Sequence, residues 1–438
     1  MYFTYFVKNY TDERILRVDY KPRIIEKVLE SGLRREGAVL VEGTKACGKT
    51  TTCKKYSKSS ITLDDALALN VAENNPNALL TGPFPHMIDE WQLAPKIWNA
   101  VRHNVDEHPE PGRFILTGSA VPPDRSEIHH TGAGRFAWIK MRPMSLWESG
   151  DSSGKVSLSA LFSDNVKEEI FIENKLTLED IAYLACRGGW PRSLSLNKEE
   201  ALGYARDYLD TIIKFDANRV NRKVKSFIRI QMLLRSLARN QGTSTPNSTI
   251  IQDLEMNFGI QISRPTFLAY TKALEEIFII ENSDAWNPKL RSKTAIRQSD
   301  THYFVDPSIA AAALEAGPQD LINDLNTLGF IFETLCIRDL RVYAQPLNGT
   351  IHHFRTQAGL ECDAVVHLNN GRYGLVKVKL GNEKAIEKGA NTLIEIANKI
   401  DTDNMNPPSF LMVLTGTYPY AYKRSDGVYV VPIGVLKD

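Results

Sequence analysis

The fold is decided by one stretch of the sequence, Gly43-Thr44-Lys45-Ala46-Cys47-Gly48-Lys49-Thr50, which matches the phosphate-loop pattern G-x-x-x-x-G-K-[ST] completely. The apolar run Ala38-Val39-Leu40-Val41 directly precedes it and predicts a buried strand, and a helix is predicted from about Lys49. Glycines at both ends let backbone N–H groups curl inward around a phosphate. Because strand, loop and helix follow one another in the required order, we expect a P-loop nucleotide site here.

The residues expected to contact the nucleotide are those of the loop and of the helical turn that follows it. In this chemistry Lys49 bridges the β- and γ-phosphate oxygens, and the hydroxyl of Thr50 is a ligand of Mg²⁺. The full set is Gly43, Thr44, Lys45, Ala46, Cys47, Gly48, Lys49, Thr50 and Thr51.

The second half of the site is predicted at Met87-Ile88-Asp89-Glu90, where an apolar strand ends in two carboxylates. We expect Asp89 to hold the Mg²⁺ through a bound water and Glu90 to act as general base on the attacking water. An acid that directly follows the metal aspartate favours ATP hydrolysis. The sequence therefore predicts ATP and Mg²⁺ as the cofactors.

Two further positions are candidates for the reaction. The strand predicted at residues 113–117 runs into Gly118 and Ser119. If this strand lies between the loop strand and the Asp89 strand, Ser119 or Thr117 reaches the γ-phosphate. Arg135 is a candidate arginine finger for a nucleotide bound to a neighbouring copy, so an oligomer is considered; the alternative is an ordinary surface arginine.

Short strands, predicted at residues 38–41, 60–63, 86–89, 113–117 and 136–139, alternate with helix-length segments in the first third of the chain. This alternation predicts an α/β fold with a parallel sheet over residues 1–148. The pattern is then mainly helical over residues 149–320. A helix and alternating strands follow over residues 321–438, so three domains are expected for the 438 residues.

Composition excludes several classes of protein. The 53 Lys and Arg residues balance 52 Asp and Glu residues, so any nucleic-acid surface has to be a local patch. No apolar run approaches the roughly 20 residues of a membrane span, and no membrane association is expected. The five cysteines form no C-x-x-C pair, which argues against a zinc knuckle or a disulfide framework and favours a cytoplasmic protein.

The helical middle offers a candidate surface for a partner. Basic residues are densest in residues 219–225, and such a face would contact DNA phosphates without sequence preference. Residues 250–280 are predicted to form a helix-turn-helix, but Arg264 and Lys272 are few contacts for a base reader. DNA and a protein therefore both remain open as partners, and a solvated helix surface is the alternative.

Several segments together resemble a family of prokaryotic AAA-type ATPases with a conserved, uncharacterised C-terminal region. They are Lys21-Pro22-Arg23, the phosphate loop, Ile88-Asp89-Glu90-Trp91-Gln92, Ile115-Leu116-Thr117-Gly118-Ser119, Gly134-Arg135 with Arg142-Pro143-Met144-Ser145-Leu146, and Gly188-Gly189-Trp190-Pro191. The resemblance covers most of the chain. It implies an AAA-like ATPase domain, then a winged-helix part, then a restriction-endonuclease-like fold.

The C-terminal part also resembles a nuclease core of the PD-(D/E)xK type through Glu333, Asp363 and Lys379. In an active site of that type, two carboxylates bind Mg²⁺ and the lysine positions the attacking water. The family usually has an acid two residues before that lysine, where this chain has Lys377. The exchange removes a metal ligand and introduces a cation, so we expect an inactive fold used for binding.

Three hypotheses about function follow. The first is an ATPase that uses hydrolysis to switch conformation on a nucleic-acid or protein partner. The second is a DNA-binding regulatory module that binds ATP and hydrolyses little of it. The third is a Mg²⁺-dependent DNA nuclease, which Lys377 argues against.

Overall fold

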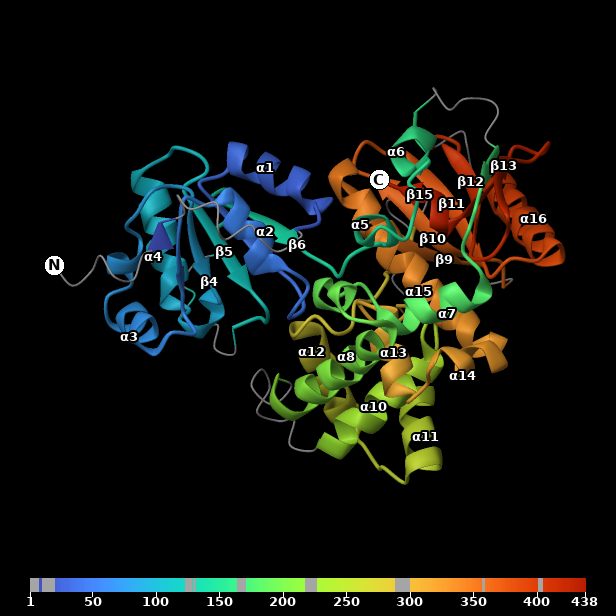
Figure 1. The fold of residues 1–438 in the computed structure, drawn as a ribbon, viewed down its shortest axis with the longest axis horizontal. Coiled ribbons are helices and arrows are strands. Elements are labelled where there is room, and N and C mark those ends of the chain that lie inside the picture. The colour runs from blue at the N-terminus through green and yellow to red at the C-terminus, as the bar shows by residue number, and fades with distance from the viewer. Residues whose placement is uncertain are drawn as a thin grey trace. The chain divides into compact units, whose positions relative to one another are not determined.

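The computed structural model describes residues 8–9, 20–122, 128, 131–163, 171–216, 227–287, 300–356, 359–400 and 405–438. Contacts divide the chain into two compact units, shown in Figure 1. The first is built mainly from residues up to Arg142, and the second from most of the chain from Pro143 onward. Each unit is described by itself, and the division into three domains remains a prediction.

The first unit contains a six-stranded sheet in the order β1-β3-β4-β5-β2-β6. All its strands are parallel except β1, which is antiparallel to β3. The bounds are β1 Lys8–Asn9, β2 Ala38–Glu42, β3 Ser59–Thr62, β4 His86–Asp89, β5 Phe114–Gly118 and β6 Phe136–Lys140. The five strands predicted from the sequence are confirmed, and β5 lies between β2 and β4 as expected.

Helices cover both faces of this sheet because its strands are apolar on both sides. Val39 and Val41 of β2 pack into a cluster with side chains of α1 (Ile25–Arg35) and α2 (Lys49–Tyr56). Their neighbours Ala38 and Leu40 point the other way, into a cluster with α3 (Ala66–Asn74) and α4 (Lys96–Glu107). Two short 3₁₀ turns, η3 (Pro76–Leu79) and η4 (Trp91–Leu93), complete the second face.

The second unit contains a seven-stranded mixed sheet in the order β8-β13-β14-β12-β11-β10-β9. Helix α15 (Leu325–Ala344) packs against β9 and β10, and α16 (Glu383–Lys399) against β11 and β12. The strands are β8 Phe171–Glu173, β9 Gly349–Arg355, β10 Glu361–Leu368, β11 Tyr373–Lys379, β12 Phe410–Thr415, β13 Tyr420–Lys423 and β14 Tyr429–Pro432. The sequence did not predict β8 or β13.

A pair of short strands, β7 (Val156–Ser157) and β15 (Leu436–Lys437), also joins the segment after residue 150 to the end of the chain. Strand β8 joins the seven-stranded sheet by pairing with β13, although it lies earlier in the sequence than the helical middle, whereas β7 and β15 form a separate two-stranded sheet.

The rest of the second unit is helical, as predicted. The helix-turn-helix is confirmed as two helices joined by a turn, with Gly259 in the left-handed conformation at the end of α11, whereas the winged-helix fold remains a prediction. The basic cluster at residues 219–225 lies outside the described residues. The helices are α5 Leu146–Ser149, α6 Leu158–Leu161, α7 Leu178–Arg187, η5 Pro191–Ser195, α8 Lys198–Thr211, the π-turn η6 Ile212–Asp216, α10 Phe227–Asn240, α11 Asn247–Phe258, α12 Arg264–Glu276, α13 Pro307–Ala313, α14 Pro318–Asn323 and η8 Gln345–Leu347, with η9 Ile433–Val435 near the C-terminus. Throughout the described ranges, every helix is too short or too polar to cross a bilayer.

A buried ion cluster connects distant segments of the second unit. The guanidinium of Arg338 lies between Asp306 at 3.0 Å and Asp339 at 2.7 Å, and all three side chains are almost completely buried. The same carboxylates accept backbone N–H groups from Gly189 and Leu146. The Gly188–Pro191 and Pro143–Leu146 segments are therefore both hydrogen-bonded to the same buried ion cluster.

His86 in β4 gives the first unit a pH-dependent stability. The imidazole is completely buried, its Nε2 donates to the carbonyl of Leu79 at 3.0 Å, and its Nδ1 lies 2.7 Å from the hydroxyl of Ser59. Burial lowers the pKa of His86 from 6.5 to about 4. The folded chain therefore keeps this imidazole neutral at pH values at which the unfolded chain binds a proton.

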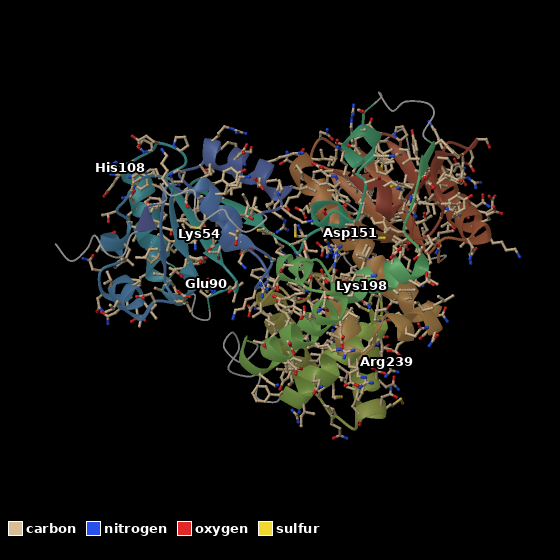
Figure 2. The ribbon with its side chains drawn as sticks, viewed as in Figure 1. Lys54, Glu90, His108, Asp151, Lys198 and Arg239 are labelled. Atoms are coloured by element: carbon tan, nitrogen blue, oxygen red, sulfur yellow. The ribbon has the colours of Figure 1, made fainter. Side chains whose placement is uncertain are left out.

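We expect the free energy of unfolding to decrease as the pH falls from about 6.5 to about 4, by about 2 kcal/mol between pH 7 and pH 5. Urea unfolding followed by tryptophan fluorescence measures it. The variant H86Q should flatten this step. The matched control is H108N, because His108 is exposed on the same unit (Figure 2). A wild-type stability that does not change over this range would contradict the prediction.

Candidate nucleotide-binding site

The phosphate loop connects β2 to α2 and has the backbone that the sequence predicts. Gly43 has a φ of 153°, and a Cβ there would lie 2.0 Å from the carbonyl oxygen of Met141. Gly48 has a φ of 103° and forms the N-cap of α2. Both positions therefore require glycine. No acidic residue lies in the first turn of α2, so the positive end of the helix dipole is uncompensated and favours an anion.

Lys49 lies inside this loop rather than on the surface. Its side chain is buried, and its Nζ donates to the carbonyls of Gly43 and Thr44, both at 2.8 Å. In these contacts two neutral carbonyls, and no carboxylate, hold the ammonium group. It is therefore ready to exchange them for phosphate oxygens.

Asp89 and Thr50 meet at the carboxyl edge of the sheet. The hydroxyl of Thr50 lies 3.1 Å from both carboxylate oxygens of Asp89, and the hydroxyl of Thr117 also donates to this carboxylate. Burial raises the pKa of Asp89, against the hydrogen bonds from Thr117 and Thr50, and the neighbouring Glu90 adds to the rise. A cation bound here would favour the ionised form of Asp89.

Glu90 follows β4 and is labelled in Figure 2. Its backbone adopts the left-handed conformation with a φ of 59°, which turns the carboxylate away from the strand. The hydroxyl of Ser119, just past β5, donates to Oε2 of Glu90 at 2.8 Å, and the amide of Gln92 donates to the same oxygen. Gln92 Nε2 also lies 3.4 Å from Ser119 Oγ. The carboxylate is thus held in one place by two donors.

Arg23 supports the loop from behind. Its guanidinium is almost completely buried and donates to the carbonyl of Cys47 at 2.7 Å and to that of Arg142 at 2.8 Å. One side chain before α1 therefore ties the phosphate loop to the segment that follows β6. We infer that Arg23 positions the loop without touching the nucleotide.

The structure brings most of the predicted site residues together. The loop, Lys49, Thr50, Asp89, Glu90 and Ser119 all lie where β2, β4 and β5 end. The sequence left Thr117 and Ser119 as alternatives, and the two make different contacts: Thr117 with Asp89, and Ser119 with Glu90. Thr51 lies in the first turn of α2 with its side chain exposed.

Arg135 is the one predicted residue that lies elsewhere. It precedes β6, and its carbonyl accepts from the N–H of Ala38 at the start of β2, so it lies at the edge of the sheet opposite the phosphate loop. Its side chain pairs with Asp106 at 2.8 Å. Arg135 therefore does not belong to the site of its own chain, and its role towards a neighbouring copy remains a prediction.

Sequence reasoning did not assign a role to Arg23 or Gln92. Both residues stand in segments that carry the family resemblance, which was the only signal available. No spacing rule links Arg23 to a loop more than twenty residues away, because the contact depends on how α1 packs against β2.

Comparison with known proteins divides the chain into recognisable parts. Residues 35–149 match a family model described as an AAA domain. Residues 178–320 match a domain of unknown function, DUF8612, and residues 328–436 match a second one, DUF4143. The N-terminal match contains the phosphate loop, Asp89, Glu90 and Ser119.

Relatives with curated sequences include uncharacterized proteins of Mycobacterium bovis and Mycobacterium tuberculosis. Each is 23% identical over 351 residues, which is 79% of this chain and 71% of the relative. A solved structure described as a Walker-type ATPase of Pyrococcus abyssi is 16% identical, with a TM-score of 0.44, and the similarity covers 68% of this chain and 97% of that one.

The role of Arg23 can be tested by nucleotide binding. We expect R23A to weaken the binding of a fluorescent ATP analogue about tenfold, because two loop-supporting hydrogen bonds from a charged donor are lost, worth about 1.4 kcal/mol. R34A is the matched control, since Arg34 lies on the exposed face of α1. An unchanged dissociation constant in R23A, with unchanged melting temperature, would show that Arg23 does not position the loop.

Proposed function

We propose that this chain, whose residues 35–149 form an AAA domain, is a Mg²⁺-dependent ATPase. The observation that carries the proposal is the position of Glu90, whose carboxylate is held by Ser119 and Gln92 directly beside the Asp89–Thr50 pair. A P-loop that only binds nucleotide does not need a second, separately oriented carboxylate at this place.

The residues at the site fit a magnesium ion. Thr50 supplies a hydroxyl oxygen and Asp89 a carboxylate, and the two are in contact. Oxygen ligands of this kind, few in number and completed by water and phosphate, suit Mg²⁺. Held by Thr50 and Asp89, the ion would neutralise negative charge that develops during phosphoryl transfer.

The loop and Lys49 bind and orient the phosphates. Lys49 turns from the carbonyls of Gly43 and Thr44 to the phosphate oxygens, while backbone N–H groups at the start of α2 face the same anion. These groups hold their positive charge in place before the reaction, so little reorganisation is needed as negative charge shifts.

Glu90 acts on the attacking water. In the present arrangement its Oε2 accepts from Ser119 and Gln92. This leaves Oε1 as the oxygen that accepts the water proton. Ser119 is also our candidate for contact with a γ-phosphate oxygen, and such a contact would change the donor set of Glu90. We propose that this exchange couples nucleotide state to the conformation of β4 and β5.

The base of the nucleotide is assigned to adenine. The pattern Asn-Lys-x-Asp that reads guanine in many GTPases occurs at Asn398-Lys399-Ile400-Asp401. Its first two residues, Asn398 and Lys399, are the last residues of α16 in the second unit and do not belong to the P-loop sheet. An acid after the magnesium aspartate also favours ATP hydrolysis.

We propose further that hydrolysis switches the protein on a nucleic-acid or protein partner in the cytoplasm. The α11–α12 helix pair is the observation that favours the alternative, a DNA-binding regulatory module with little hydrolysis. The few basic residues on α12 give it little affinity for phosphates. The first proposal is therefore preferred.

Steady-state ATP turnover tests the proposal. Wild-type protein with Mg²⁺ should hydrolyse ATP, and K49A should lower the rate roughly a hundredfold or more, because the phosphate oxygens lose their cation. K58A is the matched control, since Lys58 is exposed on the same unit just past α2. Turnover measured with added duplex DNA then distinguishes the two classes of partner. A raised ATP turnover rate indicates a nucleic acid, and an unchanged rate indicates a protein.

The variant E90Q distinguishes an ATPase that switches by hydrolysis from a regulatory module that hydrolyses little ATP. We expect a fall in turnover of roughly 10²- to 10⁴-fold with nucleotide still bound, because the amide keeps the shape of Glu90 but cannot take a proton. The measurement is ATP retention on the protein after gel filtration, with E107Q on exposed α4 as control. If wild type binds ATP and neither wild type nor E90Q hydrolyses it, the regulatory module is correct.

A further inference from the structure

The acidic side chains of the nuclease-like core gather at one place in the second unit. Asp363 and Glu361 lie on β10, and Glu333 on α15 faces them. The side chain of Asp363 is almost completely buried, whereas that of Glu361 is half exposed. We call Glu333, Glu361 and Asp363 the acidic cluster. Carboxylates brought together in this way need a positive charge nearby.

Lys377 on β11 supplies that charge. Its side chain is buried, and its Nζ lies 2.6 Å from Oδ1 of Asp363 and 3.1 Å from Oε1 of Glu361. Burial disfavours a charged lysine, but the two carboxylates outweigh it and raise the pKa of Lys377 well above its ordinary value. The ammonium is therefore charged under all physiological conditions.

Other protein groups bind two further oxygens of the cluster. The backbone N–H of Val378 donates to Oδ2 of Asp363 at 2.7 Å, and the hydroxyl of Tyr303 donates to Oε1 of Glu333 at 2.6 Å. The β10–β11 ladder ends at the pair Ala364 and Val376. Beyond that pair, the side chain of Asp363, and not a backbone carbonyl of β10, accepts the backbone N–H of Val378 on β11.

These contacts do not fit a divalent metal. Within the described ranges, no three His, Cys, Asp or Glu side chains are grouped so that they could hold a metal ion. Both oxygens of Asp363 accept hydrogen bonds, one from Lys377 Nζ and one from the N–H of Val378. A cation that replaced the ammonium would have to displace Lys377 and leave it buried without a partner, which is costly. The residues that resemble a nuclease core are therefore arranged around a different cation.

We infer that the ammonium of Lys377 is the resident cation of the acidic cluster and takes the place of a divalent metal ion. The ion pair then acts as a structural cross-link between β10 and β11, and the C-terminal sheet is a scaffold without metal-dependent cleavage. The glutamate or aspartate that the nuclease pattern has at this position would convert the cluster into a site for a divalent cation.

Metal binding to the full-length wild-type chain is the first test. Titration with Mn²⁺ alone, without nucleotide, should give the same stoichiometry for wild type and D363N, because the cluster holds no metal. Supercoiled plasmid should remain intact with Mn²⁺. A Mn²⁺ ion bound to wild type and lost in D363N, or Mn²⁺-dependent nicking lost in that variant, would overturn the inference.

Stability provides the second test. K377M should lower the melting temperature by several degrees, because it leaves Asp363 buried without its cation. The double variant K377M/D363N should melt higher than K377M, since the uncompensated charge is gone. K384M is the control, because Lys384 is exposed on α16. Additive losses in the double variant, or no loss in K377M, would show that the pair is not the cross-link.

The third test replaces Lys377 with an acidic residue, the type that the nuclease pattern has at this position. K377E should gain one Mn²⁺ site per chain that K377E/D363N lacks, and Mn²⁺ should raise its melting temperature while leaving that of wild type unchanged. If soluble K377E binds no additional Mn²⁺, Lys377 is not in the position of a metal. If K377E does not fold, the wild-type titration and the K377M pair decide the question.

Discussion

The order of parallel strands is the constraint on which the P-loop unit depends. Parallel strands end at the same edge of a sheet, and the order β4-β5-β2 places three chain turns beside one another there. The phosphate loop, Asp89 with Glu90, and Thr117 with Ser119 come from these three turns. If β5 were an outer strand of the sheet instead of lying between β4 and β2, Thr117 and Ser119 could not contact the two carboxylates. The chemistry of the site thus follows from the topology.

Buried charge has to be compensated, and three buried cations show two ways of doing this, with carboxylates or with backbone carbonyls. Arg338 is held by two carboxylates that also accept backbone N–H groups, which fixes distant segments of the second unit. Arg23 is held by backbone carbonyls, so it fixes the shape of a loop. Lys49 is held only by carbonyls of its own loop in the contacts described. The weaker the partners, the more readily the cation can exchange them for a ligand.

The sequence predicted the parts of the structure that depend on local patterns. Strands β2 to β6 and the loop were found because apolar runs and glycine spacing are properties of short segments. The short strands β8 and β13 were missed, because each has only three or four residues and the two strands pair with each other across about 250 residues of sequence. The contact of Arg23 with Cys47 was missed for the same reason. Arg135 was chosen by its neighbours in the sequence, and the structure places it at the opposite edge of the sheet.

Lys49 and Lys377 show why a residue type alone does not define a site. Both are buried lysines, and each lies in a motif with a known use for a cation. The partners of Lys49 are neutral carbonyls, so an incoming phosphate gains an interaction without breaking an ion pair. The partners of Lys377 are carboxylates, so the charge is already satisfied, and an incoming ion would have to compete with it. A buried lysine that contacts only carbonyls can still bind an anion, whereas a buried lysine paired with carboxylates occupies the place at which a cation would bind. This difference lies in the neighbours: those of Lys49 belong to its own loop, whereas those of Lys377 lie on the adjacent strand β10.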